Sequence, residues 1–542
     1  MAFKTGGELI VSSLIDNKVN VVFGIPGIYN LSIYDAIQKS SKISHILATH
    51  EGTAALMADG YARVSGKPGV CLTIAGPGAT NALTGLITAY AESSPVLLIA
   101  TEINLELVGK DLGVSHEIKN QFEIFNSTLC LSKRTKNILS IPFHLNLLFN
   151  RMKNGRPRPT YFEIPWNLLS QKKDVKKIRY LKNKKNNNDI LIKNNVIDLI
   201  NKSEFPLIFS GLGSLRSNAG KEILNLSKKI GAPIITSPNG KGIIPEDNFL
   251  SLGAGLGRNP AHQDILNKSD LILAIGTSFD IWTMKNWEIE IPGKIIRIDI
   301  CKKQLNKNYN PYIKIHGDAK LVSAEISKRI KHKTINKSWI SESFRLTRNE
   351  RSKIEEGNYF GAKILKQFKD SLPRNVIITS DTTMFLQWLV WNFDVYEENS
   401  ILLPWNSGTL GFAIPAAIGA KIAKPDKFVV AFVGDGSFMF TSQELATAAR
   451  NGVPIVVVLF NNKSHGSIKQ SQMKQFNNRT IGVDLTGIDY VSYSNSLGVP
   501  AKKITQISSI SADIKKLLNT NKPKLLEIEI SLTGLNHPWA TT

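Results

Sequence analysis

The sequence predicts an α/β protein of three domains, each a doubly wound parallel sheet with helices on both faces. Three observations favour this fold class. Short β-branched apolar runs alternate with longer helical patterns, as in successive βαβ units. A chain of 542 residues is too long for one core, because a domain usually has about 100–200 residues. Two polar stretches also interrupt the apolar pattern and divide the chain into three segments.

In chain order, the apolar runs predict strands at residues 19–23, 70–74, 96–99, 207–209, 271–275, 294–298, 376–379, 428–433 and 455–460. Several runs end within two residues of a glycine, and ligands of open α/β sheets bind at such carboxyl ends of strands. A Lys- and Asn-rich stretch at 171–188 and a charge-mixed stretch at 329–357 are the predicted linkers. The predicted domains are residues 1–170, 190–328 and 357–542.

The bulk composition excludes several classes of protein. Hydrophobic residues make up 42% and charged residues 20% of the chain, which is typical of globular proteins, and no apolar stretch is long enough to span a bilayer. The first residues lack a secretory signal pattern, so we expect a cytoplasmic location and no membrane partner. The net charge is +23. Because its Lys and Arg residues are dispersed rather than clustered, we expect no nucleic-acid partner.

The third segment carries the most informative passage, Gly434-Asp435-Gly436-Ser437, directly after a predicted strand. A helix at about 442–451 and the next strand lead from there to Asn461-Asn462. Because neighbouring parallel strands end at one edge of a sheet, Asp435 and Asn462 can converge on one oxygen-ligated ion, and Gly436 permits close approach of a diphosphate. This ligand set suits Mg²⁺. Taken alone, a Gly-Asp-Gly string is more often an ordinary strand-to-helix turn.

Further motifs occur in a fixed order along the chain. The third segment has Ser407-Gly408-Thr409-Leu410-Gly411-Phe412 before a small-residue helix, and the first segment has Phe23-Gly24-Ile25-Pro26-Gly27, His50-Glu51-Gly52, Ala58 to Arg63 and Gly76 to Asn81. This ordered set resembles the thiamine-diphosphate-dependent enzyme family, in particular acetolactate synthase large subunits and their 2-oxo acid decarboxylase relatives. The resemblance covers nearly the whole chain.

The resemblance implies a pyrimidine-binding first domain, a central domain and a diphosphate-binding third domain. It makes Glu51 the catalytic carboxylate, which shares a proton with ring N1′ of the cofactor so that its amino group can deprotonate C2. The backbone carbonyl of Gly408 would accept the 4′-amino hydrogen, and Leu410 would bend the cofactor. The implied metal ligands are Asp435, Asn462 and the backbone carbonyl of Ser464. Other implied cofactor contacts are Pro26, Asn81, Thr382, Thr383, Thr409, Gly436, Ser437, His465 and Gly466.

The implied activity is decarboxylation, carboligation or both, acting on a small-molecule 2-oxo acid through a C2 carbanion and an enamine. In the family the glutamate and the diphosphate site lie on different subunits. The resemblance therefore implies a homodimer or a homotetramer with active sites between subunits. FAD is possible, because a stretch like Ile275-Gly276-Thr277-Ser278 occurs in central domains that hold it, but the sequence does not require a flavin.

Three positions depart from ordinary acetolactate synthases. Trp282 stands where they carry an arginine for the second substrate's carboxylate, Ser471 where they carry a pocket tryptophan, and Glu102 where they carry a glutamine. Losing the arginine removes the charge that would orient an anionic acceptor. Residues 461–485 look closer to decarboxylases of larger 2-oxo acids, including guanidino-substituted ones. The substrate-pocket candidates are His116, Glu117, Met473 and His465.

Other functions stay open at this point. True acetolactate synthesis would consume pyruvate, and a flavin-linked oxidase would pass electrons to FAD. A catalytically silent paralogue would be expected to lack Glu51, Asp435 or Asn462, and all three are present. A Rossmann-type nucleotide site is disfavoured, because Gly211-Leu212-Gly213 lacks the third glycine of the fingerprint.

Overall fold

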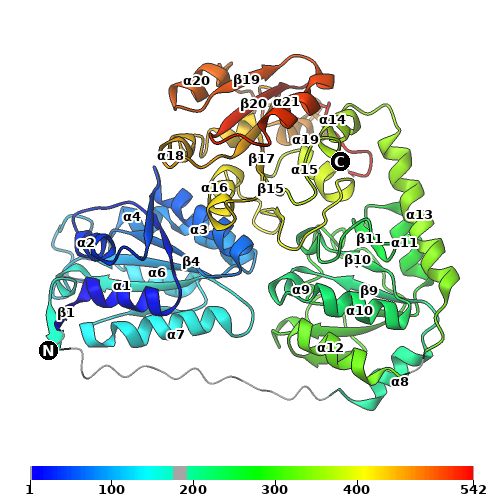
Figure 1. Cartoon of the computed structure of the whole chain (residues 1–542), viewed down its shortest axis with the longest axis horizontal. Helices are drawn as coiled ribbons and strands as arrows, with labels where there is room; N and C mark the ends of the chain where they lie inside the picture. The colour runs from blue at the N-terminus through cyan, green and yellow to red at the C-terminus, as the bar shows by residue number, and fades with distance from the viewer. Residues whose placement is uncertain (1–2, 175–191, 332, 541–542) are drawn as a thin grey trace.

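The computed structural model describes residues 3–174, 192–331 and 333–540, whose strands form three six-stranded parallel sheets (Figure 1). This confirms the predicted α/β fold of three doubly wound domains. Each predicted strand run corresponds to a strand of one of these sheets. The first domain (blue) and the central domain (green) lie side by side, and the third domain (yellow to red) contacts both.

The first sheet has the strand order β3-β2-β4-β5-β7-β6. Its strands are β2 (Val21–Gly24), β3 (Ser44–Leu47), β4 (Gly69–Thr73), β5 (Val96–Glu102), β6 (Ser132–Arg134) and β7 (Thr160–Pro165). Its helices are α1 (Gly6–Asp16), α2 (Leu31–Ser40), α3 (Glu51–Ser65), α4 (Pro77–Asn81), α5 (Leu83–Ala91), α6 (Gln121–Thr128) and α7 (Ile141–Lys153).

The central sheet has the order β11-β10-β9-β12-β13-β14. Its strands are β9 (Pro206–Ser210), β10 (Ile234–Thr236), β11 (Ser251–Ala254), β12 (Leu271–Ile275), β13 (Lys294–Asp299) and β14 (Ile313–His316). Its helices are α8 (Asn194–Lys202), α9 (Leu212–Arg216), α10 (Gly220–Ile230), α11 (Pro260–Lys268) and α12 (Ala319–Arg329).

The third sheet has the order β16-β15-β17-β18-β20-β19. Its strands are β15 (Ile377–Ser380), β16 (Ile401–Leu402), β17 (Val429–Gly434), β18 (Val456–Asn461), β19 (Ala501–Ile504) and β20 (Lys524–Glu529). Its helices are α14 (Phe360–Lys369), α15 (Phe385–Trp391), α16 (Ala413–Ala423), α17 (Asp435–Phe438), α18 (Glu444–Arg450), α19 (Gly466–Gln475), α20 (Tyr490–Ser496) and α21 (Ile510–Leu517).

Numbered within each domain, the strands of the first and third sheets have the same order, 2-1-3-4-6-5, whereas the central sheet has the order 3-2-1-4-5-6. The central order changes direction once, and the other two change direction twice. Ligands of doubly wound sheets bind at such a switch point, beyond the carboxyl ends of the strands. In the third sheet the first change of direction lies between β15 and β17. The loops that begin at Asp381 and Asp435 leave the sheet there, so the topology itself predicts a site at the passage that the sequence singled out.

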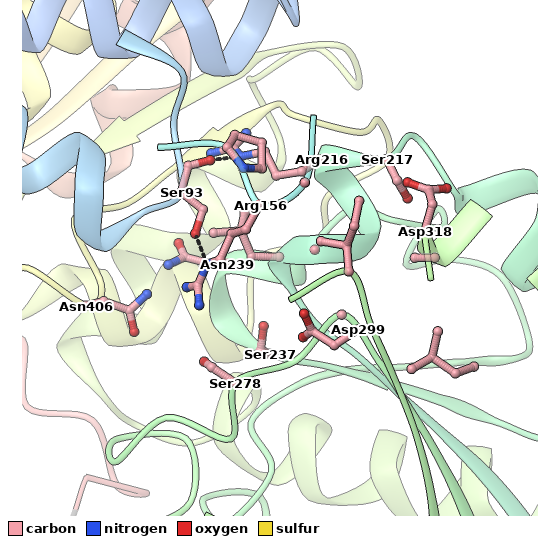
Figure 2. Close-up of a pocket in the computed structure, with 18 of the residues that line it drawn as sticks. Ser93, Arg156, Arg216, Ser217, Ser237, Asn239, Ser278, Asp299, Asp318 and Asn406 are labelled. Carbon is pink, nitrogen blue, oxygen red and sulfur yellow. Dashed lines mark hydrogen bonds between the residues drawn. The ribbon is translucent and has the colours of Figure 1, made fainter. Parts of the chain in front are cut away.

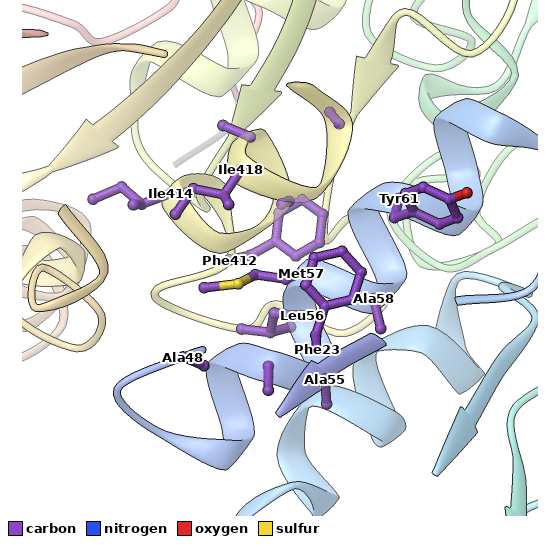
Figure 3. Packing of buried hydrophobic residues seen from close by; sticks show 14 of the residues in the cluster. Phe23, Ala48, Ala55, Leu56, Met57, Ala58, Tyr61, Phe412, Ile414 and Ile418 are labelled. Carbon is purple, nitrogen blue, oxygen red and sulfur yellow. The ribbon is translucent and has the colours of Figure 1, made fainter. Parts of the chain in front are cut away.

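The first and third domains share one hydrophobic core. Helix α3 packs directly on α16, and Figure 3 shows Phe23, Met57 and Tyr61 of the first domain beside Phe412 of the third. The helices approach closely because glycines face backbone: a Cβ at Gly60 would lie 2.3 Å from the Ala416 carbonyl oxygen. The two domains of one chain are therefore packed as tightly as a single interior.

The two predicted linkers differ from expectation in part. Residues 172–174, at the start of the first, form β8 (Lys172–Asp174), which pairs antiparallel with β1 (Phe3–Thr5); the rest of that linker lies outside the described residues. Within the second, α13 (Lys337–Glu355) is a long regular helix. Its buried residues are Trp339, Ser343, Thr347, Arg351 and Ile354. They recur every three or four residues, but most are polar, so an apolar pattern does not reveal the helix.

No helix within the described ranges is both long enough and apolar enough to cross a membrane.

Candidate active site

Asp435, Asn462 and Ser464 meet at the carboxyl edge of β17 and β18. Asp435 Oδ2 accepts hydrogen bonds from the backbone N–H groups of Asn462 and Ser464, both at 3.2 Å. The Asn462 side-chain oxygen accepts from the Ser464 N–H at 3.1 Å. These contacts hold one carboxylate and one amide oxygen in a small space, as a hard divalent cation requires. The described residues contain no separate cluster of three His, Cys, Asp or Glu residues arranged for a metal.

Two glycines allow close packing at this corner. A Cβ at Gly436 would lie 2.6 Å from His465 Nδ1, and a Cβ at Gly466 would lie 2.4 Å from the Asn462 side-chain nitrogen. Neither position could carry a larger residue without displacing a predicted cofactor contact. Glycines at the carboxyl ends of strands are typical of phosphate-binding loops.

Asp381 ties three loops of the site together, although nothing in the sequence singled it out. Its carboxylate accepts hydrogen bonds from the Ser437 hydroxyl at 2.6 Å and the Ala413 N–H at 2.8 Å. The Gly411 N–H in turn donates to Ser437 Oγ at 2.8 Å. Burial raises the pKa of Asp381 to about 6. The Ser437 side chain, predicted to touch the cofactor, thus also fixes the loop that carries Gly408.

A cavity of about 290 Å³ lies between the central and third domains. Its lining includes the predicted cofactor contacts Thr382, Thr383 and Gly408. Thr383 Oγ1 is buried and has no hydrogen-bond partner in the described structure, and a buried hydroxyl without a partner is costly. The residues that line this cavity come from the central and third domains. The first domain of the same chain does not contribute to that lining.

Glu51 lies in the first domain at the first turn of α3, whose preceding residue His50 caps the helix. Asn81 donates to Glu51 Oε2 at 3.0 Å, so two predicted contacts are adjacent. Pro26 is exposed in the loop after β2. Beside Glu51, the Thr53 hydroxyl donates to Glu444 Oε1 at 2.5 Å. Within one chain, the residues around Glu51 therefore contact α18.

Two further contacts connect the Gly408 loop to the first domain. The hydroxyls of Thr409 and Thr88 are 2.7 Å apart. Buried Glu92 accepts hydrogen bonds from the backbone of Asn406 at 2.6 Å and Ser407 at 3.2 Å. Burial raises the pKa of Glu92. Leu410 is half-buried in the same loop. The sequence did not indicate Glu92 or Glu444, because the partners that connect them across the two domains are more than 300 residues away.

Three of the substrate-pocket candidates lie apart from this cavity, whereas the fourth, His465, lies against Gly436 at the cofactor corner. Glu117 accepts hydrogen bonds from the backbone of its own loop, including the Asp111 N–H at 3.0 Å. The ring of His116 lies 5.2 Å from that of Tyr29. Met473 is on α19, whose residues are all exposed or half-buried. These three residues do not line the cavity, and their role stays a prediction.

A second cavity, of about 140 Å³, lies where the three domains meet (Figure 2). Arg156 of the first domain donates to Ser93 Oγ at 2.9 Å. Arg216 donates to the backbone oxygens of Ser93 at 3.0 Å and Glu92 at 3.2 Å, and burial lowers its pKa to about 10. Burial also raises the pKa of Asp299. This cavity lies at the switch point of the central sheet, between β9 and β12.

Three doubly wound domains, with polar loops and glycines at the carboxyl edge of the third sheet, define the class of α/β enzymes that bind a ligand at such an edge. Comparisons with known proteins agree. Residues 4–126 match the thiamine pyrophosphate enzyme N-terminal TPP binding domain, residues 194–326 the central domain and residues 381–528 the C-terminal TPP binding domain. The chain belongs to the thiamine pyrophosphate enzyme family and is a thiamine-diphosphate-dependent enzyme of the acetolactate-synthase-like group.

Named relatives differ in activity. The chain is 34% identical to a probable acetolactate synthase large subunit of Methanocaldococcus jannaschii, over 97% of this chain and 92% of the relative. It is 30% identical to a probable 2-ketoarginine decarboxylase of Pseudomonas aeruginosa, over 97% and 94%. It is also 30% identical to the acetolactate synthase large subunit of Haemophilus influenzae, over 99% and 96%.

Proposed function

We propose that this enzyme decarboxylates a 2-oxo acid with thiamine diphosphate and Mg²⁺, and then releases an aldehyde or joins the product to an acceptor. The observation that carries the proposal is the convergence of Asp435, Asn462 and Ser464 at the switch point of the third sheet, next to a cavity lined by Gly408. Decarboxylation of a 2-oxo acid needs a group that accepts the electron pair of the broken C–C bond, and amino acid side chains do not supply such a group. The cavity and the polar groups around it suit a cofactor that does.

The residues present fit the cofactor. Thr383 Oγ1, buried without a partner, is available to donate to a phosphate oxygen. Gly436 and Gly466 stand where a Cβ would collide with the side chains of His465 and Asn462. Asp435 and Asn462 supply two hard oxygen ligands, and an extended Ser464, bridged to Asp484, supports the predicted carbonyl ligand. Mg²⁺ bound with the diphosphate would complete its coordination with phosphate oxygens and water.

Thiamine diphosphate, when bound, supplies the carbon nucleophile and the electron sink for loss of CO₂. The residues of the chain orient it and move protons. The carbonyl of Gly408, whose φ is +64°, would accept the amino hydrogen of the pyrimidine. Leu410 would support the ring from below. The Glu51 carboxyl would hold the proton at ring N1′, and Asn81, 3.0 Å away, keeps that carboxyl oriented.

We propose that the active unit contains at least two chains, with Glu51 of one facing the diphosphate site of the other. Two observations favour this arrangement. The cavity lining lacks residues of the first domain. Large apolar side chains are also exposed beside both halves of the site, on the first domain at Ile28 and Ile87 and on the third at Phe440 and Ile481, the last 84% exposed. A second chain would cover these surfaces, as a dimer or a tetramer.

True acetolactate synthesis is the second candidate, because two of the relatives carry that name. Trp282 weakens it in part, since an indole cannot form the ion pair that an arginine offers to the carboxylate of a second oxo acid, which leaves Arg258 as the cation of the cavity lining. A flavin role would use the cavity between the three domains, where two arginines could meet phosphates. FAD is not needed for the proposed reaction. The absorbance spectrum of the purified protein, near 450 nm, tests for it directly.

The test is CO₂ release from a panel of 2-oxo acids by the purified protein with thiamine diphosphate and Mg²⁺. We expect E51Q to bind the cofactor but to lose about 10²–10⁴-fold in kcat, the range typical of a lost proton-transfer group. E106Q, at an exposed glutamate of the same domain, is the matched control and should keep wild-type turnover. Equal turnover by wild type and E51Q would disprove the assignment. Chelation with EDTA should abolish turnover and cofactor binding together.

A further inference from the structure

The lining of the cavity of about 290 Å³ has a polar part and an apolar part. Thr382, Thr383, Gly408 and Ser467 lie at or beside predicted cofactor contacts. The rest of the lining is mainly apolar. Its large apolar side chains are Leu256, Trp282, Met384, Leu386, Trp391 and Trp405. Because the reacting atoms of a bound cofactor must face its substrate, this apolar wall is where the substrate's side chain would lie.

Trp405 is held in one orientation by the central domain. Its indole N–H donates to Asp280 Oδ1 at 3.2 Å. The same carboxylate accepts the Thr283 N–H at 3.0 Å and the Thr283 hydroxyl at 2.7 Å. Asp280 thereby fixes the loop that carries Trp282 and the indole of Trp405 at once. A wall built this way is preorganised and need not rearrange to bind a ligand.

The loop that carries Trp282 has an unusual backbone. Phe279, Lys285, Asn286 and Trp287 have φ values between +49° and +60°, although none is glycine. Trp287 stabilises the loop by donating from its indole N–H to the Phe279 carbonyl at 2.9 Å. Trp282 itself is 58% exposed at the cavity mouth. Strained, well-supported backbone that presents an exposed aromatic at a cavity is typical of functional sites.

The charge of the substrate's side chain distinguishes guanidino-substituted 2-oxo acids from large apolar ones. Arg258 is the charged residue in the cavity lining, and burial lowers its pKa. A substrate with a guanidinium would find no carboxylate among the residues that line the cavity, so its charge would lose hydration without compensation. A neutral apolar side chain has no such cost. Pyruvate, with only a methyl group, would leave the three indoles without contact.

We propose, on the basis of the function proposed above, that Trp282 and Trp405 select 2-oxo acids with a large uncharged apolar side chain, branched or aromatic. Asp280 is the positioning residue that holds both. Such a wall contacts the side chain of the substrate. The carboxylate of the substrate remains free to leave as CO₂.

The test measures kcat/KM of the holoenzyme for pyruvate, 4-methyl-2-oxopentanoate, 2-oxo-3-phenylpropanoate and 5-guanidino-2-oxopentanoate. We expect the branched and aromatic acids to exceed both others by at least tenfold, because each hydrophobic contact in a pocket changes specificity by about 10–200-fold. W282A should lower kcat/KM for the preferred acids by about tenfold or more, mainly through KM, and leave that for pyruvate within about threefold. F249A removes an exposed central-domain aromatic that does not line the cavity, and it should change neither.

Each outcome has one meaning. If pyruvate or the guanidino acid is the best substrate, or if W282A lowers all substrates equally, the selection by tryptophan is wrong while the proposed function stands. If no acid releases CO₂ although the cofactor binds in equilibrium dialysis, both proposals fail. D280N should weaken discrimination in the same direction as W405F, while D280N keeps its cofactor affinity; unchanged discrimination in both variants would overturn the positioning role.

Discussion

Glu102 lies at the end of β5 in a buried group of polar side chains, and its carboxylate is 1% exposed. It accepts the Ile103 N–H at 2.8 Å and lies 3.6 Å from Arg134. Burial, and then the nearby Glu163, raise the pKa of Glu102 to about 7. The sequence marked this residue only as a departure from glutamine. In the structure, the glutamate at position 102 has a physical consequence, because its carboxyl group keeps a proton up to about pH 7.

The raised pKa of Glu102 sets the sign of a pH effect on stability. Between about pH 4.5 and 7 the folded chain keeps this proton and the unfolded chain does not, so stability falls as the pH rises through that window. E102Q should remove the loss and stabilise the protein at pH 8, by at most about 3 kcal/mol, with little change at pH 4.5. Urea unfolding at several pH values measures this, with E106Q as the exposed control. A gain that is the same at all pH values would contradict the explanation.

The residues of the site fall into two groups, according to how far away along the chain their partners lie. Asp435, Asn462 and Gly408 stand in local strings after strands, which is why the sequence could predict them. Asp381, Glu92 and Glu444 act through partners on distant segments, and single carboxylates of this kind are common in loops. The geometry of the fold was needed to find them.

Helices α3 and α16 illustrate the same limit at the scale of elements. The sequence indicated α16 as a small-residue helix and α3 through the motifs at Glu51 and at Ala58 to Arg63, and every predicted strand run occurs in the fold. Their packing on one another was not visible, because small residues permit close approach without specifying a partner. Helix α13 was missed for a different reason, since its buried side is mostly Ser, Thr and Arg. Apolar periodicity therefore predicted the sheets better than the elements between domains.

Glycine at the crossing of α3 and α16 makes a testable prediction. Alanine normally stabilises a helix interior relative to glycine by about 1 kcal/mol. G60A and G419A should do the opposite and cost about 1–3 kcal/mol, because a new Cβ would lie 2.3 Å and 2.0 Å from backbone oxygens of the facing helix. G487A is the matched control, since a Cβ there meets nothing within 4 Å. Thermal unfolding measures the stability of each variant. If G60A and G419A are as stable as G487A, the two helices can move apart without cost.

Helix α19 is only partly covered by the rest of the described chain. None of its residues is buried, and Ile468 is 55% exposed although the helix begins next to His465. A short helix without a buried face is not stable by itself. The second chain proposed above would supply the missing contact, and α19 should become protected from hydrogen exchange when that chain associates.

At the scale of the whole molecule, sharing of sites between chains predicts complementation. E51Q damages one half of a site and D435N the other half. Mixed dimers of the two variants would contain one intact site and one doubly damaged site. Because random pairing makes half of the dimers mixed, co-expressed variants should regain about a quarter of wild-type activity. Separately tagged chains, purified through both tags, isolate the mixed dimers, which should have about half of wild-type activity. Activity no higher than either variant alone would place Glu51 and Asp435 of one chain in the same site.

The shared core of the first and third domains also constrains how the chain is made. Thr49 and Glu444, which are hydrogen-bonded across that core, are 395 residues apart. At about 5–20 residues per second, a ribosome needs roughly 20–80 s between the two. For most of that time the face of α3 that packs on α16 is uncovered, whereas the rest of the helix can already pack on α5, β2 and β4 of the first domain. The nascent N-terminal domain is thus exposed to misassociation for most of translation, and chaperone supply should limit the yield of this enzyme more than its final stability does.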